Sequence, residues 1–227
     1  MSILPQRLVR AFSRQTRAVL ELALPGSCLL CGDESGPHLL CADCQADLPS
    51  APATSCPQCG ELTTFSERCG ACLNKPPHFD RTLTLFRYEF PVDRLIHAFK
   101  YGHQLAVGQW LGQRLAERIA PGAELIIPLP LHAERLRERG FNQAMEMARE
   151  IEKTAKIPVD RSSLQRTRAT PPQAGLDHKE RRKNVRGAFE CTRDLSGRHV
   201  LLVDDVMTTG ATLDECARIL KLHGAIE

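Results

Sequence analysis

Two adjacent carboxylates and a cluster of hydroxyl groups stand together late in the sequence. The stretch LLVDDVMTTGAT runs from apolar residues into Asp204 and Asp205 and then into a turn rich in threonine. The apolar run 200–203 predicts a fully buried strand. Because functional groups at the carboxyl end of such a strand open into the crevice where α/β sheets bind ligands, we expect a binding site here.

The turn that follows has the chemistry of a phosphate site. A helix is expected from about Thr212, so the amides and hydroxyls of residues 208–212 converge at a helix N-terminus. Gly210 lacks a Cβ and allows close backbone approach. Two carboxylates repel a phosphate, so an electropositive or hydroxyl-bearing group must lie between the carboxylates and the phosphate, and a ribose fits. Its 2- and 3-hydroxyls can donate to Asp204 and Asp205. The alternative is a purely structural βα turn with Thr as helix cap.

Eight cysteines form a second chemical pattern, an internal repeat. Each unit has two C-x-x-C pairs separated by nine residues, and the second unit repeats the first at an offset of 28. Two such pairs complete a tetrahedral four-sulfur site, so we predict two structural Zn²⁺ ions. A disulfide scaffold or redox dithiol is the alternative. Sequential pairing closes the shortest loops, and interleaved pairing stays open. The predicted ligands are Cys28, Cys31, Cys41, Cys44, Cys56, Cys59, Cys69 and Cys72.

Composition and charge place limits on the protein class. The chain has 227 residues, 42% hydrophobic and 25% charged, which is ordinary for a globular protein. We expect a cytoplasmic protein, because no apolar run approaches the roughly 18 residues of a membrane span and no secretion signal is recognisable. The net charge is only +3, but residues 161–198 hold ten Lys or Arg against four Asp or Glu. This basic segment contains TPPQAG, which favours an extended or mobile loop.

The remaining elements alternate between strand and helix. An amphipathic helix is expected over residues 1–24, a zinc module over 25–77 and a main domain over 78–227. Within the main domain we expect strands at 81–90, 124–130 (running into a loop), 157–168, 185–192 and 198–206. Helices are expected at 91–102, 104–120, 132–155 and 212–223. This alternation predicts an α/β fold with a mostly parallel sheet and helices on both faces. Arginines 7, 10, 14 and 17 form a stripe on the first helix, either a solvated face or a phosphate contact.

Several of these motifs together resemble a known family. VLLVDDVMTTGAT is similar to the phosphoribosyl-pyrophosphate (PRPP) loop of type I phosphoribosyltransferases. PLPLHAERLRERGFNQA, FKYGHQLAVGQWLG, the basic segment and the cysteine-rich N-terminal part resemble the ComF family, including its GntX branch, in the expected order. The resemblance implies a phosphoribosyltransferase-like fold with a double zinc ribbon. It also implies that PRPP and Mg²⁺ bind at Asp204, Asp205, Val206, Met207, Thr208, Thr209, Gly210, Ala211 and Thr212.

Further roles follow from the chemistry of PRPP. Its pyrophosphate must be held by cations. Arg135 and Arg139 lie one helical turn apart and are the candidates for this role. The equally weighted alternative is that they are two exposed arginines on a helix. His132 is either a phosphate donor or a helix cap. The basic segment resembles the loop that folds over PRPP in this superfamily. Gln173, Arg181 and Arg182 are its candidate contacts.

Two functions are compatible with these features. The first is a phosphoribosyltransferase with an acceptor that the sequence does not identify. The second is a non-enzymatic factor that binds single-stranded DNA and uses the PRPP fold as a sensor or scaffold. The resemblance implies that the protein acts in DNA uptake during natural transformation. It also implies that other competence proteins are further partners. A short strand normally follows the last helix in this fold, whereas the sequence stops at HGAIE, which leaves catalytic competence open.

Overall fold

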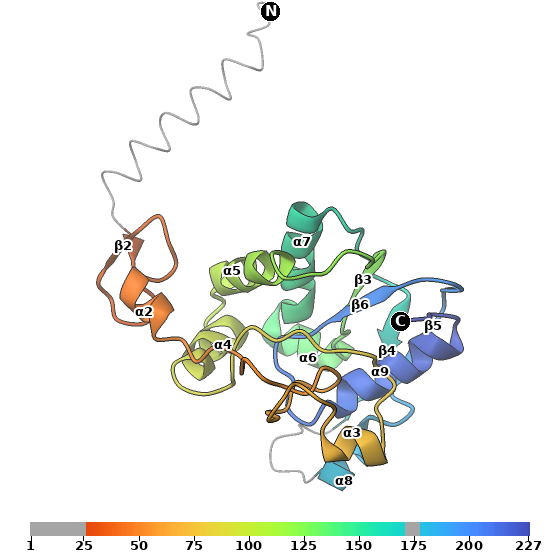
Figure 1. Ribbon diagram of the computed structural model, residues 1–227. Coiled ribbons are helices and arrows are strands. Elements are labelled where there is room, and N and C mark those ends of the chain that lie inside the picture. Colours follow the sequence, from red (N-terminus) through yellow and green to blue (C-terminus); the bar gives the residue numbers. More distant parts are fainter. Residues whose placement is uncertain (1–25, 171–177) are drawn as a thin grey trace, which may run out of the picture.

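The computed structural model describes residues 26–170 and 178–227 (Figure 1). The helix expected over 1–24 lies outside these ranges. Within the described ranges, no helix is both long enough and apolar enough to cross a membrane.

A parallel strand pair lies at the centre of the main domain. β3 (Leu125–Pro128) and β6 (Val200–Val203) pair in parallel, with Leu125 opposite Val200, and Ile126 forms a parallel bridge to Val159 on the other side. All four residues of β3 are buried, as expected of a strand covered on both faces. In the apolar run before Asp204, by contrast, Val203 is buried and the other three residues of β6 are half-buried, so the expectation of a fully buried strand at 200–203 is only partly met.

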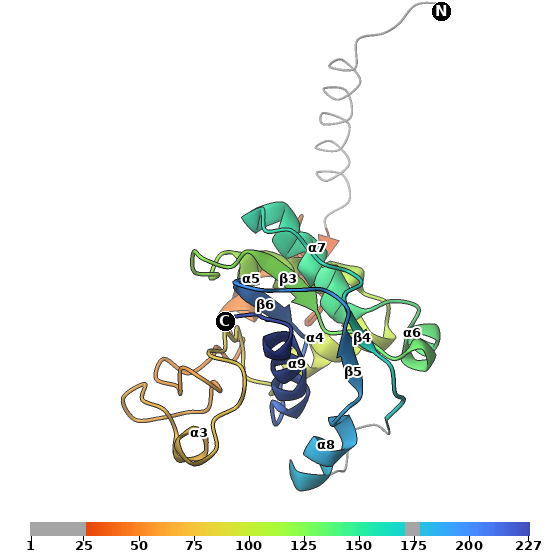
Figure 2. The ribbon, with the colours of Figure 1, turned by 90° about the vertical axis from the view of Figure 1, so that its right-hand side faces the viewer.

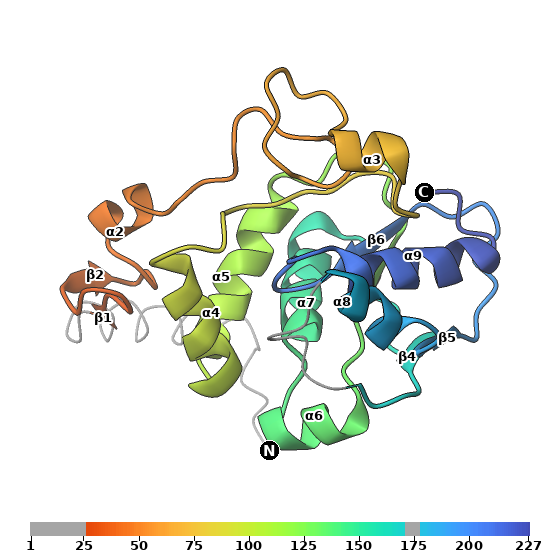
Figure 3. The ribbon, with the colours of Figure 1, turned by 90° about the horizontal axis from the view of Figure 1, so that it is seen from below.

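Helices cover both faces of this pair, as Figures 1 and 3 show. Ile126, Leu201 and Val203 face α5 (Leu105–Ala116) and α7 (Gln143–Ala155). Leu125 and Ile127 belong to the core on the other face, which contains α9 (Ala211–Leu222). This alternation follows from the two-residue period of a strand. The expected α/β architecture with helices on both faces is confirmed.

Two glycines allow α5 to pack closely against its neighbours. A Cβ on Gly108 would lie 2.4 Å from the ring of Phe99 in α4 (Val92–Tyr101), and one on Gly112 would lie 2.7 Å from the Met147 carbonyl of α7. Phe99 is fully buried as a result. This packing fixes the C-terminal end of α4 beside the end of the sheet.

Several expected elements are interrupted. The helix expected over 132–155 divides into α6 (Ala133–Arg139) and α7, because Gly140 adopts a left-handed φ of 76° and caps α6. The expected strand at 81–90 makes only one bridge, from Phe86 to Ser50. Its partner segment carries Pro49 and Pro52, which have no N–H to extend the ladder.

The basic segment begins and ends in an antiparallel pair, not in strands of the parallel sheet. β4 (Leu164–Arg166) pairs with β5 (Phe189–Cys191), and α8 (His178–Val185) precedes β5 and packs against α9. Figure 2 shows this pair and α8 on the α9 side of the molecule.

The cysteine-rich part consists of two small units. The first holds β1 (Gly26–Ser27), β2 (Glu34–Gly36) and α2 (Ala42–Ala46), and the second holds α3 (Gly70–Asn74). Leu40 and Leu48 of the first unit enter the core that contains α4 and α5. The second unit lies near α9, where the segment after it contributes the ion pairs His78 with Asp214 and Asp80 with Lys221.

Candidate functional site: two cysteine clusters and a carboxylate-hydroxyl turn

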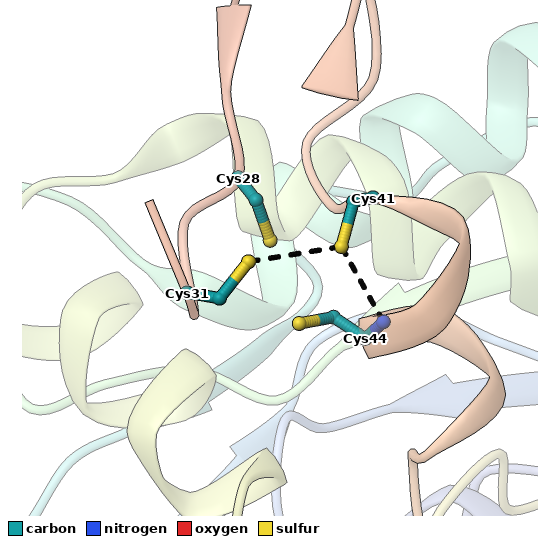
Figure 4. A group of neighbouring side chains, drawn as sticks. All are labelled: Cys28, Cys31, Cys41 and Cys44. Atoms are coloured by element: carbon teal, nitrogen blue, oxygen red, sulfur yellow. Dashed lines mark hydrogen bonds between the residues drawn. The ribbon is translucent and has the colours of Figure 1, made fainter. Parts of the chain in front are cut away.

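The eight repeat cysteines gather into two groups of four. Figure 4 shows the side chains of Cys28, Cys31, Cys41 and Cys44 pointing toward one another. Their sulfur atoms all lie within 4.8 Å of each other, and the same holds for the group formed by Cys56, Cys59, Cys69 and Cys72. The pairing is therefore sequential, and the interleaved alternative is wrong.

The first cluster has the geometry that zinc requires. Four sulfurs at about 2.3 Å from Zn²⁺ lie about 3.8 Å apart, and Cys31 Sγ lies 3.7 Å from Cys41 Sγ. Gly32, with φ of 84°, donates its N–H to the Cys28 carbonyl and forms the knuckle after the first pair. Burial opposes ionisation of Cys28, but hydrogen bonds from the amides of Cys31 and Cys41 stabilise the thiolate and lower its pKa to about 6.

The second cluster repeats this arrangement. Cys59 Sγ lies 3.6 Å from Cys69 Sγ, and Gly60 donates to the Cys56 carbonyl with φ of 78°. Burial again opposes ionisation, and the amides of Cys69 and Cys59 lower the pKa of Cys56 to about 6. Four thiolates leave no open position for a substrate, so both clusters are structural zinc sites.

The carboxylate pair lies directly at the end of β6. Asp204 Oδ1 accepts a hydrogen bond of 2.9 Å from the Asp205 amide. Lys100 Nζ, from the last turn of α4, lies 2.8 Å from Asp205 Oδ2, and both side chains are largely buried. Lys100 was not among the site residues predicted from the sequence. Its motif, FKYGHQ, matched the ComF pattern, but only the packing of α4 brings the ammonium group to the carboxylates.

The two carboxylates differ in their electrostatics. Burial raises the pKa of Asp204, and repulsion from the Asp205 carboxylate raises it further, to about 8. The ammonium group of Lys100 lowers the pKa of Asp204 and so partly offsets this rise. The apoprotein therefore holds a carboxyl group that is easily protonated beside a carboxylate that is paired with a cation.

The turn after the carboxylates is held open at the start of α9. Gly210 is the N-cap of α9 with φ of 69°, and a Cβ there would lie 2.8 Å from Met207 Cε. Within the described part of the chain, the amides of residues 206–210 donate to no backbone carbonyl. The hydroxyl of Thr209 accepts from the Ala211 amide at 3.4 Å. A row of available amides at a helix N-terminus suits a phosphate.

The arginines predicted to contact pyrophosphate lie near the site but engage protein groups. Arg135 Nη1 donates to Glu138 at 2.8 Å, and Arg139 Nη1 donates to Gln143 Oε1 at 3.1 Å. The Arg139 guanidinium also lies over the ring of Tyr101. His132 caps α6 by accepting from the Glu134 amide. The pyrophosphate roles of the two arginines stay predictions.

The basic segment contributes an arginine that sequence reasoning missed. Arg166, at the end of β4, is half-buried and packs over the ring of Phe189. Burial lowers its pKa, and the nearby negative charge of Asp204 partly opposes this. Arg182 is exposed on α8, whereas Gln173 and the Arg181 side chain lie outside what the structure describes. The sequence pattern alone could not distinguish Arg166 from the other nine Lys and Arg residues of the segment 161–198.

A cavity of about 470 Å³ adjoins the carboxylates. Asp204 and Asp205 are among its lining residues, and most of the remaining lining is aliphatic or aromatic, from the segment 79–86, α5, β6 and α9. An apolar wall does not suit a phosphate. The two carboxylates and the turn are therefore the part of this region that fits a phosphorylated sugar.

Fold and site define a class: a phosphoribosyltransferase-type domain that carries two structural zinc sites. Comparison with known proteins agrees, since residues 19–73 match the double zinc ribbon domain and residues 136–227 the phosphoribosyl transferase domain. The chain is 35% identical over 215 residues to the DNA utilization protein YhgH of Escherichia coli O157:H7, covering 90% of this chain and 94% of the relative.

Two further relatives carry competence names. The chain is 35% identical over 200 residues to competence protein F of Haemophilus influenzae, covering 83% and 86% of the two chains. It is 26% identical over 209 residues to competence protein ComFC of Bacillus subtilis, covering 82% and 79%. The chain belongs to the ComF family.

Proposed function

We propose that this protein binds PRPP together with Mg²⁺ at the turn after β6 and acts in the uptake or use of DNA. The observation that supports this ligand is the order of groups at the carboxyl end of the parallel strand β6. Two carboxylates are followed by amides that donate to no backbone carbonyl within the described residues, and Gly210 closes the turn. The names of the relatives, competence protein F and DNA utilization protein, support the cellular role.

Different residues would hold different parts of PRPP. Asp204 and Asp205 would accept hydrogen bonds from the ribose hydroxyls, and the turn 206–212 would hold the 5-phosphate through its amides and hydroxyls. Lys100 forms an ion pair with Asp205 and so holds this carboxylate in place. The two carboxylates also have the oxygen chemistry to hold Mg²⁺, which when bound would neutralise charge on the pyrophosphate.

The reaction would be transfer of the phosphoribosyl group. A nucleophilic atom of an unidentified acceptor bonds to C1 of the ribose, the bond from C1 to the pyrophosphate oxygen breaks, and pyrophosphate leaves with the electron pair. Arg135, Arg139, Gln173, Arg181 and Arg182 are the proposed cationic and polar contacts to the leaving group. The last three belong to the basic segment, which would exclude water, and Arg181 and Arg182 lie on its helix α8.

Isothermal titration calorimetry tests the ligand. Wild-type protein with Mg²⁺ should bind PRPP, and the double variant Asp204→Ala, Asp205→Ala should not, because the ribose hydroxyls lose both acceptors. Asp194→Ala is a matched control, since this exposed carboxylate bonds only to nearby Ser196 among the described residues. Equal PRPP affinity in the wild type and the double variant would contradict the proposal.

A second candidate function is a non-enzymatic zinc protein that binds single-stranded DNA and uses the PRPP fold as sensor or scaffold. It is favoured by the net charge of +6 over residues 161–198. Neutralising Arg181, Arg182 and Lys183 should weaken binding to a single-stranded oligonucleotide and reduce its dependence on salt. Binding that survives this change, or that does not respond to salt, would count against this function.

A further inference from the structure

One face of α4 is exposed and combines aromatic with basic side chains. Arg94, His97 and Tyr101 are spaced by three and four residues, so they lie along one side of the helix, and all three are exposed. Leu95 and Phe99 on the other side are buried in the core. We refer to Arg94, His97 and Tyr101 as the α4 face. Figure 3 shows α4 at the periphery of the molecule, along the same edge as α6.

The aromatic ring at the end of this face is held in place yet open to solvent. Tyr101 is 60% exposed, although it is a large side chain that usually packs when it can. The His97 ring lies 4.9 Å from it, and the guanidinium carbon of Arg139 lies 5.5 Å from its centroid. Because Tyr101 contacts two neighbours and is still exposed, its ring is available for stacking with a planar group of a ligand.

The electrostatics of the region favour an anionic partner. From residue 94 to residue 116 the sequence contains three Lys or Arg and no Asp or Glu. Among the described residues, neither Arg94 nor Arg139 forms an ion pair with a carboxylate. Lys100 is the exception, because it pairs with Asp205 at the phosphoribosyl site. Arg94 on the α4 face and Arg139 of α6 are therefore cations available for phosphates, and Tyr101 offers a ring to a base.

We infer that the α4 face is a binding surface for single-stranded nucleic acid, with one base stacked on Tyr101 and the backbone phosphates near Arg94 and Arg139. Stacking on an exposed aromatic side chain requires an unpaired base, and a basic surface with interspersed rings is the usual means of holding such strands. This inference rests on the nucleic-acid part of the proposed function. A strand on this face would pass beside the carboxylates, since Lys100 joins α4 to Asp205.

Fluorescence anisotropy with two labelled 12-mers tests the inference, one of thymidines and one abasic with the same phosphates. Tyr101→Ala should weaken binding to the thymidine strand on the order of ten-fold, as loss of one stacked base does, and should leave binding to the abasic strand unchanged. Tyr101→Phe should behave as wild type. Arg94→Gln should weaken binding to both strands and lower the salt slope by about 0.7.

Tyr88→Ala is the matched control, because Tyr88 is 55% exposed before the other end of α4. A thymidine strand that carries 5-iodouracil should cross-link to the Tyr101 peptide on irradiation. If wild type binds the strand but Tyr101→Ala binds it equally well, the α4 face is not the surface and the proposed function stands. If wild type binds neither strand, the nucleic-acid function itself fails, whatever the result with PRPP.

Discussion

At the scale of single residues, the site is a balance of three charges. Asp204 and Asp205 repel each other at the end of β6, and among the described residues Lys100 is the cation paired with them. Burial and this repulsion raise the pKa of Asp204 to about 8. The apoprotein thus carries an unfavourable interaction that ribose hydroxyls would relieve, because they donate to the carboxylates.

The raised pKa predicts how PRPP binding depends on pH. Above pH 7 the ligand phosphates are mostly ionised, so the remaining change comes from Asp204, which must lose a proton to accept two hydroxyl donors. Affinity should rise by up to ten-fold per pH unit until pH passes about 8 and then level off. Calorimetry from pH 7 to 9 measures this. Asp204→Asn should remove the rise, and an unchanged pH profile in that variant would contradict the assignment.

The raised pKa of Asp204 also predicts how stability depends on pH. The free energy of unfolding should fall over the pH range in which PRPP affinity rises. A carboxyl group whose pKa is raised on folding binds more protons in the native state, so its contribution to stability falls as pH rises from about 4 to about 8. Asp204→Asn abolishes this loss. The variant should therefore melt on the order of 10 °C above wild type at pH 8.5, and the difference should disappear near pH 4. Melting curves at the two pH values test it.

At the scale of elements, the site depends on how α9 and α7 begin. α9 starts at Gly210 in a left-handed conformation, and α7 starts at Asn142, whose side chain accepts from the Met145 amide and donates to the Leu129 carbonyl. Both helix starts lie at the carboxyl end of the parallel strands. The caps therefore set the geometry of the ligand turn.

Replacing Gly210 tests whether the turn needs this geometry. Gly210→Ala should cost about 1–2 kcal/mol from the left-handed φ and should also abolish PRPP binding, because the turn can relieve that strain only by shifting the amides proposed to hold the phosphate. The new Cβ would lie 2.8 Å from Met207 Cε, but this atom ends a flexible side chain that can move aside. Gly197→Ala is the matched control, since Gly197 has φ of 74° and no heavy atom within 4 Å of an added Cβ. Both variants should lose similar stability in urea unfolding. Only Gly210→Ala should lose the ligand.

The sequence predicted those elements whose pattern is local. The run Val200–Val203, the turn after it and the helix Ala211–Leu222 follow from apolar period and helix-start signals. The segment 81–90 has strand composition, but pairing depends on a partner, and Pro49 and Pro52 limit it to one bridge. Lys100 contacts Asp205 only because α4 packs beside β6, and β4 brings Arg166 close enough for the charge of Asp204 to affect its pKa; no sequence period encodes either arrangement.

At the scale of the whole molecule, the zinc units attach to different parts of the main domain. The first inserts Leu40 and Leu48 into the core beside α4 and α5. The second joins α9 through the ion pairs of His78 and Asp80, which are exposed and therefore worth little individually. Loss of the two metals should thus have unequal effects on the fold.

Single cysteine variants separate the two sites. Native mass spectrometry should find two zinc ions per wild-type chain and one in either Cys41→Ser or Cys69→Ser. Cys41→Ser should lower the melting temperature by several degrees more, because it disturbs a unit that shares the main core. Equal shifts, or loss of both ions from one variant, would contradict the independence of the two clusters.

The close spacing of the cysteines also has a consequence for synthesis of the chain. Both thiolate sets are complete once Cys72 has emerged from the ribosome, whereas α5, which covers Leu40 and Leu48, begins at Leu105. The first ribbon must therefore capture its ion and hold its shape while its apolar side chains still await their partner helix. The supply of zinc during translation, and not only the supply available to the finished protein, should set how much of the chain reaches the folded state.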